Sequence, residues 1–348
     1  MAENKIIGDV LPKFRVAAVQ TTPVFLNREA TINKVEAKVK EAKKQGAQLI
    51  VFPESFVPTF PYWAFNMAPN QQGALTRRLY ANAVEVPGKA FNRLQEIARN
   101  NKVYLSIGVT EKSTVTIGTM WNTSLLFDPE GALIGHHRKI MPTFAEKLVW
   151  SFGDGSSLRT HKTELGNIGT LICGENSNTL AKYALGAQGE QVHISVYPAC
   201  SLSFASADYA ECLKARTIAH SFESKVYNIC CSACIDQDAL VQIAAGDKEM
   251  EKKLLNLPAT VFGMTMVTEP SGHICSDILM NNKEGIIYAD CDLTKALTPK
   301  SIHDIYGCYQ RFDIFQLHVN RAHRVPVKFY NEDVEDKEFI PYVETEDV

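Results

Sequence analysis

Three side chains that could together perform nucleophilic chemistry each follow an apolar segment of the chain. Glu54 comes after the run Val-Phe-Pro, Lys139 after His-His-Arg, and Cys173 after Leu-Ile. A free thiol, with a reference pKa of about 8.5, needs a base or a positive neighbour to form a nucleophilic thiolate at neutral pH. A carboxylate and an ammonium group would supply both, so these residue types predict a centre with a cysteine nucleophile.

Each of the three residues also has a purely structural interpretation. Glu54 could cap the helix or turn after its strand, Lys139 could be a solvated strand end, and Cys173 could be a small buried hydrophobic residue, as free cysteine commonly is. Their shared position at the ends of apolar segments favours chemistry, because α/β proteins often present catalytic residues at the ends of buried strands.

The elements that must position these residues are predicted from hydrophobic periodicity. Short apolar runs indicate buried strands, and apolar residues at spacings of three and four indicate a first helix that Asn27 caps and Gly46 ends. Strand, helix and strand form a βαβ-like unit with Glu54 just past its second strand. The predicted strands are 14–20, 47–52, 103–109, 122–127, 133–139, 167–172, 192–197, 226–235, 260–268 and 286–292, and further helices are predicted over 89–100, 179–188 and 205–224.

Two other segments carry features that we interpret as structural. The segment Asp236–Pro258 is charged and has no clear partner in the core pattern, which predicts a surface insertion. Cys230, Cys231 and Cys234 have the spacing of half a zinc site or a redox pair. They lie in an apolar strand run without a second pair of ligands, and this favours packing.

The sequence does not decide the roles of two further pairs of charged or titratable residues. His136 and His137 precede Lys139 and could tune it, although such a pair more often lines a strand end. Arg216 and Glu223 lie two turns apart on a predicted helix, which favours a buried ion pair or a contact in a dimer over a role in chemistry.

Composition excludes several classes of partner and location. The formal net charge is -3 and no basic stripe is present, so a nucleic-acid partner is not expected. No run approaches the roughly 18 apolar residues that would span a bilayer, and Met1–Pro12 lacks the pattern of a signal peptide. The nine cysteines are scattered through apolar strands, which suits free thiols in a reducing compartment. We therefore expect a cytoplasmic protein without a membrane partner.

Three motifs resemble the signature regions of the nitrilase superfamily, in the same order and with similar spacing. The likeness runs from about Arg15 to about Asn320. Two further segments resemble the nitrilase branch of the superfamily rather than its amidase branches. The three motifs are Val51–Ser55 with Phe60–Trp63, His137–Thr143, and Leu171–Asn176; the branch segments are Phe144–Trp150 with Gly153–Gly155, and Ala187–His193.

The resemblance implies a fold, a reaction class and an assembly. It implies an α/β fold built as a four-layer αββα sandwich, which would place a single carbon–nitrogen hydrolase domain over residues 1–320 and leave 321–348 as a polar C-terminal tail. It also implies hydrolysis of a non-peptide carbon–nitrogen bond without a cofactor or metal. Homo-oligomers are expected as well, either dimers or larger helical assemblies.

The resemblance assigns a role to each candidate residue in the hydrolysis of an organic nitrile. Glu54 takes the proton of Cys173, and Lys139 with the backbone N–H of Gly174 stabilises the negative charge that develops on the nitrile nitrogen. Glu146 orients Lys139 or the substrate. Water converts the thioimidate into a thioester as ammonia leaves, and a second water releases the carboxylic acid.

The substrate pocket is less well defined by the sequence. Phe60, Tyr62 and Trp63 could line it with apolar surface, or could belong to ordinary loop packing. Many nitrilases carry Trp directly after the nucleophile, whereas Gly174 occupies that position here. The loss of this large side chain leaves the range of nitriles and the balance between acid and amide product open.

Two alternatives to a nitrilase remain at this point. An amidase, a carbamoylase or a cyanide-processing enzyme would share the Glu–Lys–Cys centre and differ only in its pocket. A non-catalytic assembly or binding protein could retain the sandwich, although the presence of all three chemical residues argues against this.

Overall fold

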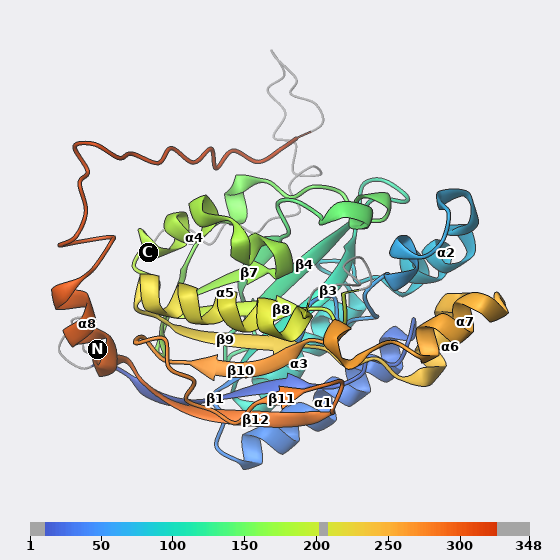
Figure 1. Ribbon diagram of the computed structural model, residues 1–348, viewed down its shortest axis with the longest axis horizontal. Coiled ribbons are helices and arrows are strands. Elements are labelled where there is room, and N and C mark those ends of the chain that lie inside the picture. Colours follow the sequence, from blue (N-terminus) through green and yellow to red (C-terminus); the bar gives the residue numbers. More distant parts are fainter. Residues whose placement is uncertain (1–10, 202–207, 326–348) are drawn as a thin grey trace.

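The computed structural model describes residues 11–201 and 208–325, and two β-sheets that face one another dominate it (Figure 1). Within these residues each sheet has six strands. The first sheet has the order β12 (Gly285–Asp292), β1 (Lys13–Gln20), β2 (Leu49–Val51), β3 (Tyr104–Lys112), β4 (Met120–Phe127), β5 (Leu133–Arg138). The second has the order β11 (Leu279–Met280), β10 (Met264–Thr268), β9 (Tyr227–Ser232), β8 (Val192–Tyr197), β7 (Gly166–Ile172), β6 (His161–Thr163).

Helices cover the outer face of each sheet. Apolar side chains of α1 and α3 pack on the first sheet, and those of α4 and α5 pack on the second. The α-helices of the described residues are α1 (Arg28–Lys44), α2 (Gly73–Asn82), α3 (Lys89–Asn101), α4 (Thr179–Gly186), α5 (Tyr209–Ser224), α6 (Gln237–Ala244), α7 (Lys248–Leu255) and α8 (Leu297–Ile302).

The pleat of the strands explains this layering. In β1, Val16 and Ala18 belong to the apolar cluster between the two sheets, whereas Ala17 and Val19 belong to the cluster shared with α1 and α3. Successive strand side chains point to opposite faces, so a sheet that is covered on both faces requires nearly continuous apolar strands. The predicted four-layer αββα sandwich is confirmed.

Local sequence positions the first helix as predicted. The Asn27 side chain accepts the N–H of Ala30 at 3.1 Å and caps α1. The face that carries Ile32, Val35 and Val39 is buried, and the chain leaves the helix through Gly46 with a positive φ of 83°.

Strand ends deliver the three candidate residues. β2 ends at Val51, three residues before Glu54, and β5 ends at Arg138, directly before Lys139. β7 ends at Ile172, directly before Cys173. The strands β1 and β2 run parallel, as the predicted βαβ-like unit requires, and β2 and β7 also run parallel to β3 and β8.

The segment Asp236–Pro258 is not a surface insertion without a core partner, so that prediction was wrong. It forms the helices α6 and α7, whose residues Leu240, Ile243 and Leu254 are buried in an apolar cluster that also contains Trp63. Its charged residues lie on the outer side of these helices. Because they alternate with the apolar residues along the chain, the apolar face is hard to recognise from the sequence.

Other boundaries differ by a few residues from the prediction. Helix α5 starts at Tyr209, and residues 205–207 of the predicted helix lie outside the described residues. β9 and β10 are shorter than predicted, and α2 and α8 were not predicted. The acid-rich end of the chain, 331–348, also lies outside the described residues, so the division between a domain and a tail stays a prediction. No helix of the described residues has the length and apolar character needed to cross a bilayer.

The cysteine pair in β9 takes part in packing on both faces of its sheet. Cys230 lies in the cluster beneath α5, and Cys231 lies in the cluster between the sheets. The Cys231 thiol donates to the carbonyl oxygens of Val19 and Val51 at 3.5 and 3.4 Å. Cys234 is also buried, and all three are free thiols.

We predict that Ile243→Ala lowers the free energy of unfolding by about 2–5 kcal/mol, because it leaves a cavity in a closed apolar cluster. Val241→Ala is the matched control on the same helix, since this side chain is 40% exposed. Urea unfolding followed by fluorescence measures both variants. If both variants lost the same small amount of unfolding free energy, the burial of Ile243 on α6 would not contribute to stability, which would contradict the prediction.

Candidate active site

A buried lysine joins two carboxylates at the centre of the candidate site. Lys139 Nζ donates to Glu54 Oε1 at 2.9 Å and to Glu146 Oε2 at 2.7 Å. All three side chains are almost completely removed from water. Charges in such a place persist only when they are paired and hydrogen-bonded.

The neighbouring strand β4 holds the lysine and its base together. The backbone N–H of Lys139 donates to the carbonyl oxygen of Asn122 at 2.8 Å. The Asn122 side-chain amide donates to Glu54 Oε1 at 2.6 Å. Sequence analysis missed Asn122, because nothing in its local sequence shows that β4 lies beside the loop of Glu54.

A glycine allows the Glu54 loop to approach β3. A Cβ atom at Gly108 would lie 2.3 Å from the carbonyl oxygen of Pro53 and 2.4 Å from the backbone nitrogen of Ser55. Ser55 itself adopts a positive φ of 44°, which costs conformational energy for a residue other than glycine. The position of Glu54 is therefore fixed by close backbone packing on both sides.

Cys173 occupies a strained turn between β7 and a short 3₁₀ helix, Cys173–Ser177. Its φ is 50°, in the left-handed region that side chains other than glycine rarely adopt. The carboxylate of Glu175 accepts the N–H groups of Ile172 at 2.8 Å and Ile140 at 2.7 Å. Glu175 also bonds His137 Nε2 at 2.8 Å. These bonds tie the cysteine turn to the segment that carries Lys139.

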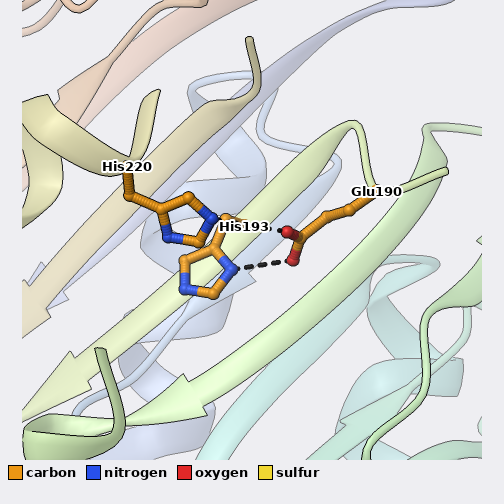
Figure 2. Close-up of side chains that lie close together, drawn as sticks. All are labelled: Glu190, His193 and His220. Atoms are coloured by element: carbon orange, nitrogen blue, oxygen red, sulfur yellow. Dashed lines mark hydrogen bonds and ion pairs between the residues drawn. The ribbon is translucent and has the colours of Figure 1, made fainter. Parts of the chain in front are cut away.

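A second buried network supports the same turn, and Figure 2 shows its members Glu190 and His193. The Asn176 amide donates to the carbonyl oxygens of Leu171 and Cys173 at 3.1 Å, so its Oδ1 is left to accept a hydrogen bond from His193 Nε2 at 2.8 Å. His193 Nδ1 then meets Glu190 Oε1 at 2.7 Å. Burial lowers the pKa of His193 to about 3 and raises the pKa of Glu190, so burial opposes a charge on either partner of this bond.

The same network is the one group of the described residues whose side chains could share a metal ion. Glu190, His193 and His220 offer ligand atoms within 4.8 Å of one another. In Figure 2 the Glu190 carboxylate faces both imidazole rings, and its Oε2 is 3.5 Å from His220 Nε2. None of the three lines the cavity beside Cys173. Their pairing with one another makes them a structural support of the nucleophile turn.

The charges around the lysine set the proton affinities of the site. Burial raises the pKa of Glu54 to about 7, against the lowering effect of the Lys139 ammonium. Burial opposes the charge on Lys139, but Glu146 and Glu54 outweigh it and hold the pKa of Lys139 well above its ordinary value. Burial and the negative charge of Glu54 raise the pKa of Cys173 to about 12. At neutral pH the site therefore contains a neutral thiol beside a partly ionised carboxyl group.

One oxygen of Glu54 is free to act as a base. Oε1 binds Lys139 and Asn122, whereas Oε2 is buried and has no hydrogen-bond partner within the described residues. A thiol with a raised pKa does not ionise by itself, so attack requires transfer of its proton to such a group as the new bond forms. The geometry can supply a base, a cation and a nucleophile together.

A cavity of about 330 Å³ opens beside Cys173. Of the predicted site residues, the structure places Phe60, Tyr62, Glu146 and Gly174 along its wall with Cys173. The other lining residues are Phe65, Thr143, Pro198, Cys200, Ser201, Tyr209, Cys212 and Arg216. A cavity of this volume lies at the small end of ligand pockets and suits a small organic substrate.

The prediction that Trp63 lines the pocket was wrong. Trp63 is fully buried in the apolar cluster with α6, and its ring meets Phe25 edge-on at 6.1 Å. The chain turns through a short 3₁₀ helix, Tyr62–Phe65, so neighbouring side chains point in different directions. Tyr62 faces the cavity, and its hydroxyl accepts the N–H of Ala199 at 2.8 Å.

Gly174 has a specific neighbour in this cavity. A Cβ atom at this position would lie 2.9 Å from Thr143 Oγ1, so any larger residue would have to displace a side chain that also lines the cavity. The Thr143 side chain therefore occupies the position beside the nucleophile that a side chain at residue 174 would need.

The two histidines before Lys139 stabilise the frame of the site. His136 Nε2 lies 2.8 Å from Glu111 Oε2, and Arg138 bonds the same carboxylate. His137 bonds Glu175, as described above. Their side chains are thus directed to these carboxylates at the end of β5.

Two further residues of the cavity were not predicted as part of the site. The Tyr209 hydroxyl lies 4.0 Å from Cys173 Sγ, and Arg216 follows two turns later on α5. Of the two alternatives for Arg216 and Glu223, the buried ion pair is wrong, because Glu223 pairs with Lys182 at 3.3 Å. The contact in a dimer stays a prediction. Spacings of three and four place Tyr209, Cys212 and Arg216 on one helix face, but the sequence does not reveal that this face meets Cys173.

Comparison with known proteins agrees with this geometry. The sequence profile of the carbon-nitrogen hydrolase family matches residues 15–297. The chain belongs to the carbon-nitrogen hydrolase family. The resemblance to the nitrilase superfamily is thereby confirmed, and with it the expectation of an enzyme that acts on carbon–nitrogen bonds.

Relatives and a solved structure cover most of this carbon-nitrogen hydrolase. A nitrilase of Bacillus sp. (strain OxB-1) is 34% identical over 325 residues, 93% of each chain. A nitrilase of Paraburkholderia phymatum is 34% identical over 313 residues, 90% of this chain and 88% of its own length. The crystal structure of a carbon-nitrogen hydrolase from Helicobacter pylori G27 has a TM-score of 0.68 at 18% identity, covers 87% of this chain and 97% of its own, and shares the fold.

We predict that Lys139→Met destabilises this carbon-nitrogen hydrolase by about 3–5 kcal/mol, because it leaves buried carboxylates without their cation. The ammonium lowers the pKa of Glu54, so its removal raises that pKa further. A carboxyl group whose pKa is raised by folding stabilises the folded state at low pH and loses that contribution as the pH rises through the raised value. The deficit of the variant is therefore larger at about pH 8.5 than at about pH 5.5.

Thermal unfolding of the wild type and the variant at both pH values measures this effect. Lys162→Met is the control, since Lys162 is exposed on β6. Its replacement also removes one positive charge but leaves no buried carboxylate without a cation. A deficit that is independent of pH would contradict the assignment of the buried carboxylates as its cause.

Proposed function

We propose that this enzyme is a nitrilase that converts an organic nitrile and two waters into a carboxylic acid and ammonia, with Cys173 as its nucleophile. The observation that carries the proposal is the arrangement of the buried charged groups and the cavity that Cys173 and Glu146 line. Cys173 borders it, Lys139 is held between Glu54 and Glu146, and one Glu54 oxygen is unoccupied within the described residues. The relatives at 34% identity are named nitrilases and support the same reaction.

In the first half of the proposed reaction the thiol adds across the nitrile. The Cys173 sulfur forms a bond to the nitrile carbon while its proton moves to Glu54, and one carbon–nitrogen π bond becomes a lone pair on nitrogen. The Lys139 ammonium and the N–H of Gly174, near the start of a 3₁₀ helix where N–H groups lack intrahelical partners, stabilise that charge. Proton transfer to nitrogen gives a thioimidate.

The second half of the reaction releases both products. Water adds to the thioimidate carbon, the carbon–nitrogen bond breaks, and ammonia leaves a thioester on Cys173. A second water, deprotonated by Glu54, displaces the sulfur and gives the carboxylic acid. Glu146 holds Lys139 in place through the 2.7 Å bond and acts as a positioning residue.

Ammonia release, with acid and amide quantified by mass spectrometry, tests this proposal on aliphatic, aryl and arylacetic nitriles, hydrogen cyanide and the matching amides. We expect acid from nitriles with the wild type and a loss of at least about 10³-fold with Cys173→Ala. Turnover of amides or carbamoyl compounds alone would reassign the enzyme to the amidases or carbamoylases, and turnover of cyanide alone to the cyanide-processing enzymes. No turnover by a folded protein would favour a non-catalytic binding protein.

We also propose that the protein is a cytoplasmic homo-oligomer. Leu180 on α4 and Phe222 on α5 are 62% and 55% exposed on the outer layer of the sandwich, where a second copy could cover them. All nine cysteines are free thiols, which suits a reducing compartment. Light scattering should show a dimer or a larger assembly, and Phe222→Asp should weaken it; a monomer at all concentrations would contradict the proposal. Fractionation of cells locates the protein.

A further inference from the structure

The cavity beside Cys173 has two charged lining residues, and within the described residues only Glu146 has an ion-pair partner. Glu146 accepts hydrogen bonds from Lys139 at 2.7 Å and from the N–H of Thr143 at 2.8 Å. Arg216 is half-buried, and no carboxylate of the described residues forms an ion pair with it.

The position of Arg216 relates it to the reacting atoms. Tyr209, Cys212 and Arg216 lie on the same face of α5 and all line the cavity. The Tyr209 hydroxyl lies 4.0 Å from Cys173 Sγ, so the N-terminal end of this helix face lies beside the nucleophile. Seven residues of helix advance by about 10 Å. A long side chain such as Arg216 can therefore meet the far end of a small molecule whose reacting carbon lies at Cys173.

A guanidinium that lines a mostly apolar cavity favours an anionic ligand there. Partial burial removes some of its hydration, and aromatic rings such as Phe60 and Phe65 in the cavity wall cannot replace the lost hydrogen bonds. Guanidinium groups recognise carboxylates through two parallel hydrogen bonds. Glu146 lies on the short helix Phe144–Leu148 and is already paired with Lys139, whereas Arg216 lies on α5. An anion that binds Arg216 would therefore not have to break the ion pair between Glu146 and Lys139.

We propose that Arg216 binds a carboxylate of the substrate, so that the preferred substrates are small aliphatic nitriles that carry a carboxylate a few carbon atoms from the nitrile group. This inference rests on the proposed nitrilase function and specifies its substrate class. The nitrile carbon lies at Cys173 and the carboxylate lies at Arg216, while the spacer contacts the apolar wall. The products of such a reaction are dicarboxylic acids and ammonia.

A matched pair of nitriles tests the proposal. The anionic probe is 3-cyanopropanoate, and the neutral probe is 4-methylpentanenitrile, in which an isopropyl group of similar shape replaces the carboxylate. We expect the wild type to favour the anionic probe in kcat/KM. Arg216→Gln should reduce the ratio of kcat/KM for the two probes by roughly 10- to 100-fold, chiefly through KM, and Arg216→Lys should restore part of it.

Lys214→Gln is the matched control, because it removes one positive charge from the same helix on its solvent side and should leave the ratio unchanged. Preference of the wild type for the neutral probe would overturn the proposal. If Arg216→Gln lowered kcat/KM equally for both probes, the proposal would also be overturned. Arg216 would then act on the Cys173 sulfur and not on the carboxylate of the substrate.

Binding separates this proposal from the proposed function. Isothermal titration of Cys173→Ala with 3-cyanopropanoate should show binding that is lost when Arg216→Gln is added. If this result holds while neither nitrile is hydrolysed by the wild type, the carboxylate site stands and the nitrilase function fails. If nitriles are hydrolysed but Arg216→Gln leaves binding unchanged, the nitrilase function stands and the carboxylate site fails.

Discussion

The buried ion pairs of Lys139 are the interaction on which the rest of the site depends. They bring together a carboxylate that follows β2, a lysine that follows β5 and a second carboxylate from the short helix Phe144–Leu148. Taking charges out of water costs more free energy than one pair alone returns, and further hydrogen bonds from Asn122 and Thr143 to one oxygen of each carboxylate offset part of that cost. The positions of these segments are thus coupled.

This constraint also determines which proton moves. Lys139 stays charged, the Cys173 thiol stays neutral, and the pKa of Glu54 is raised to about 7, where a carboxyl group can accept and return a proton. Two separate hydrogen-bond networks, one through Glu175 and one through Asn176, fix the strained turn of Cys173. The Glu175 network connects this turn to Ile140, which follows Lys139. The strain at the nucleophile is therefore supported by buried hydrogen bonds rather than by the apolar core alone.

Much of the fold could be predicted from the sequence where local signals agree. The apolar runs of β1 and β2, the cap and stop of α1, and the turn between β4 and β5 each identify an element without tertiary information. The three chemical residues could be found because each follows such a run, and the resemblance added Glu146. Asn122 and Arg216 could not be found, since their significance depends on which element lies opposite. Trp63 was misinterpreted because a pocket wall and an apolar core contain the same residue types. The helices α6 and α7 were misinterpreted because the charged residues of their outer side hide the apolar face in the sequence.

The central claim is that Cys173 forms a covalent bond to the substrate with Glu54 as its base. Rapid acid quenching of the enzyme with a nitrile that it hydrolyses, followed by digestion and peptide mass spectrometry, tests this most directly. We predict a thioimidate or thioester mass increment on the peptide that contains Cys173, which forms during the first turnover and is absent from Glu54→Gln. Acid production in a single turnover without any adduct, or an adduct on another cysteine, would contradict the account.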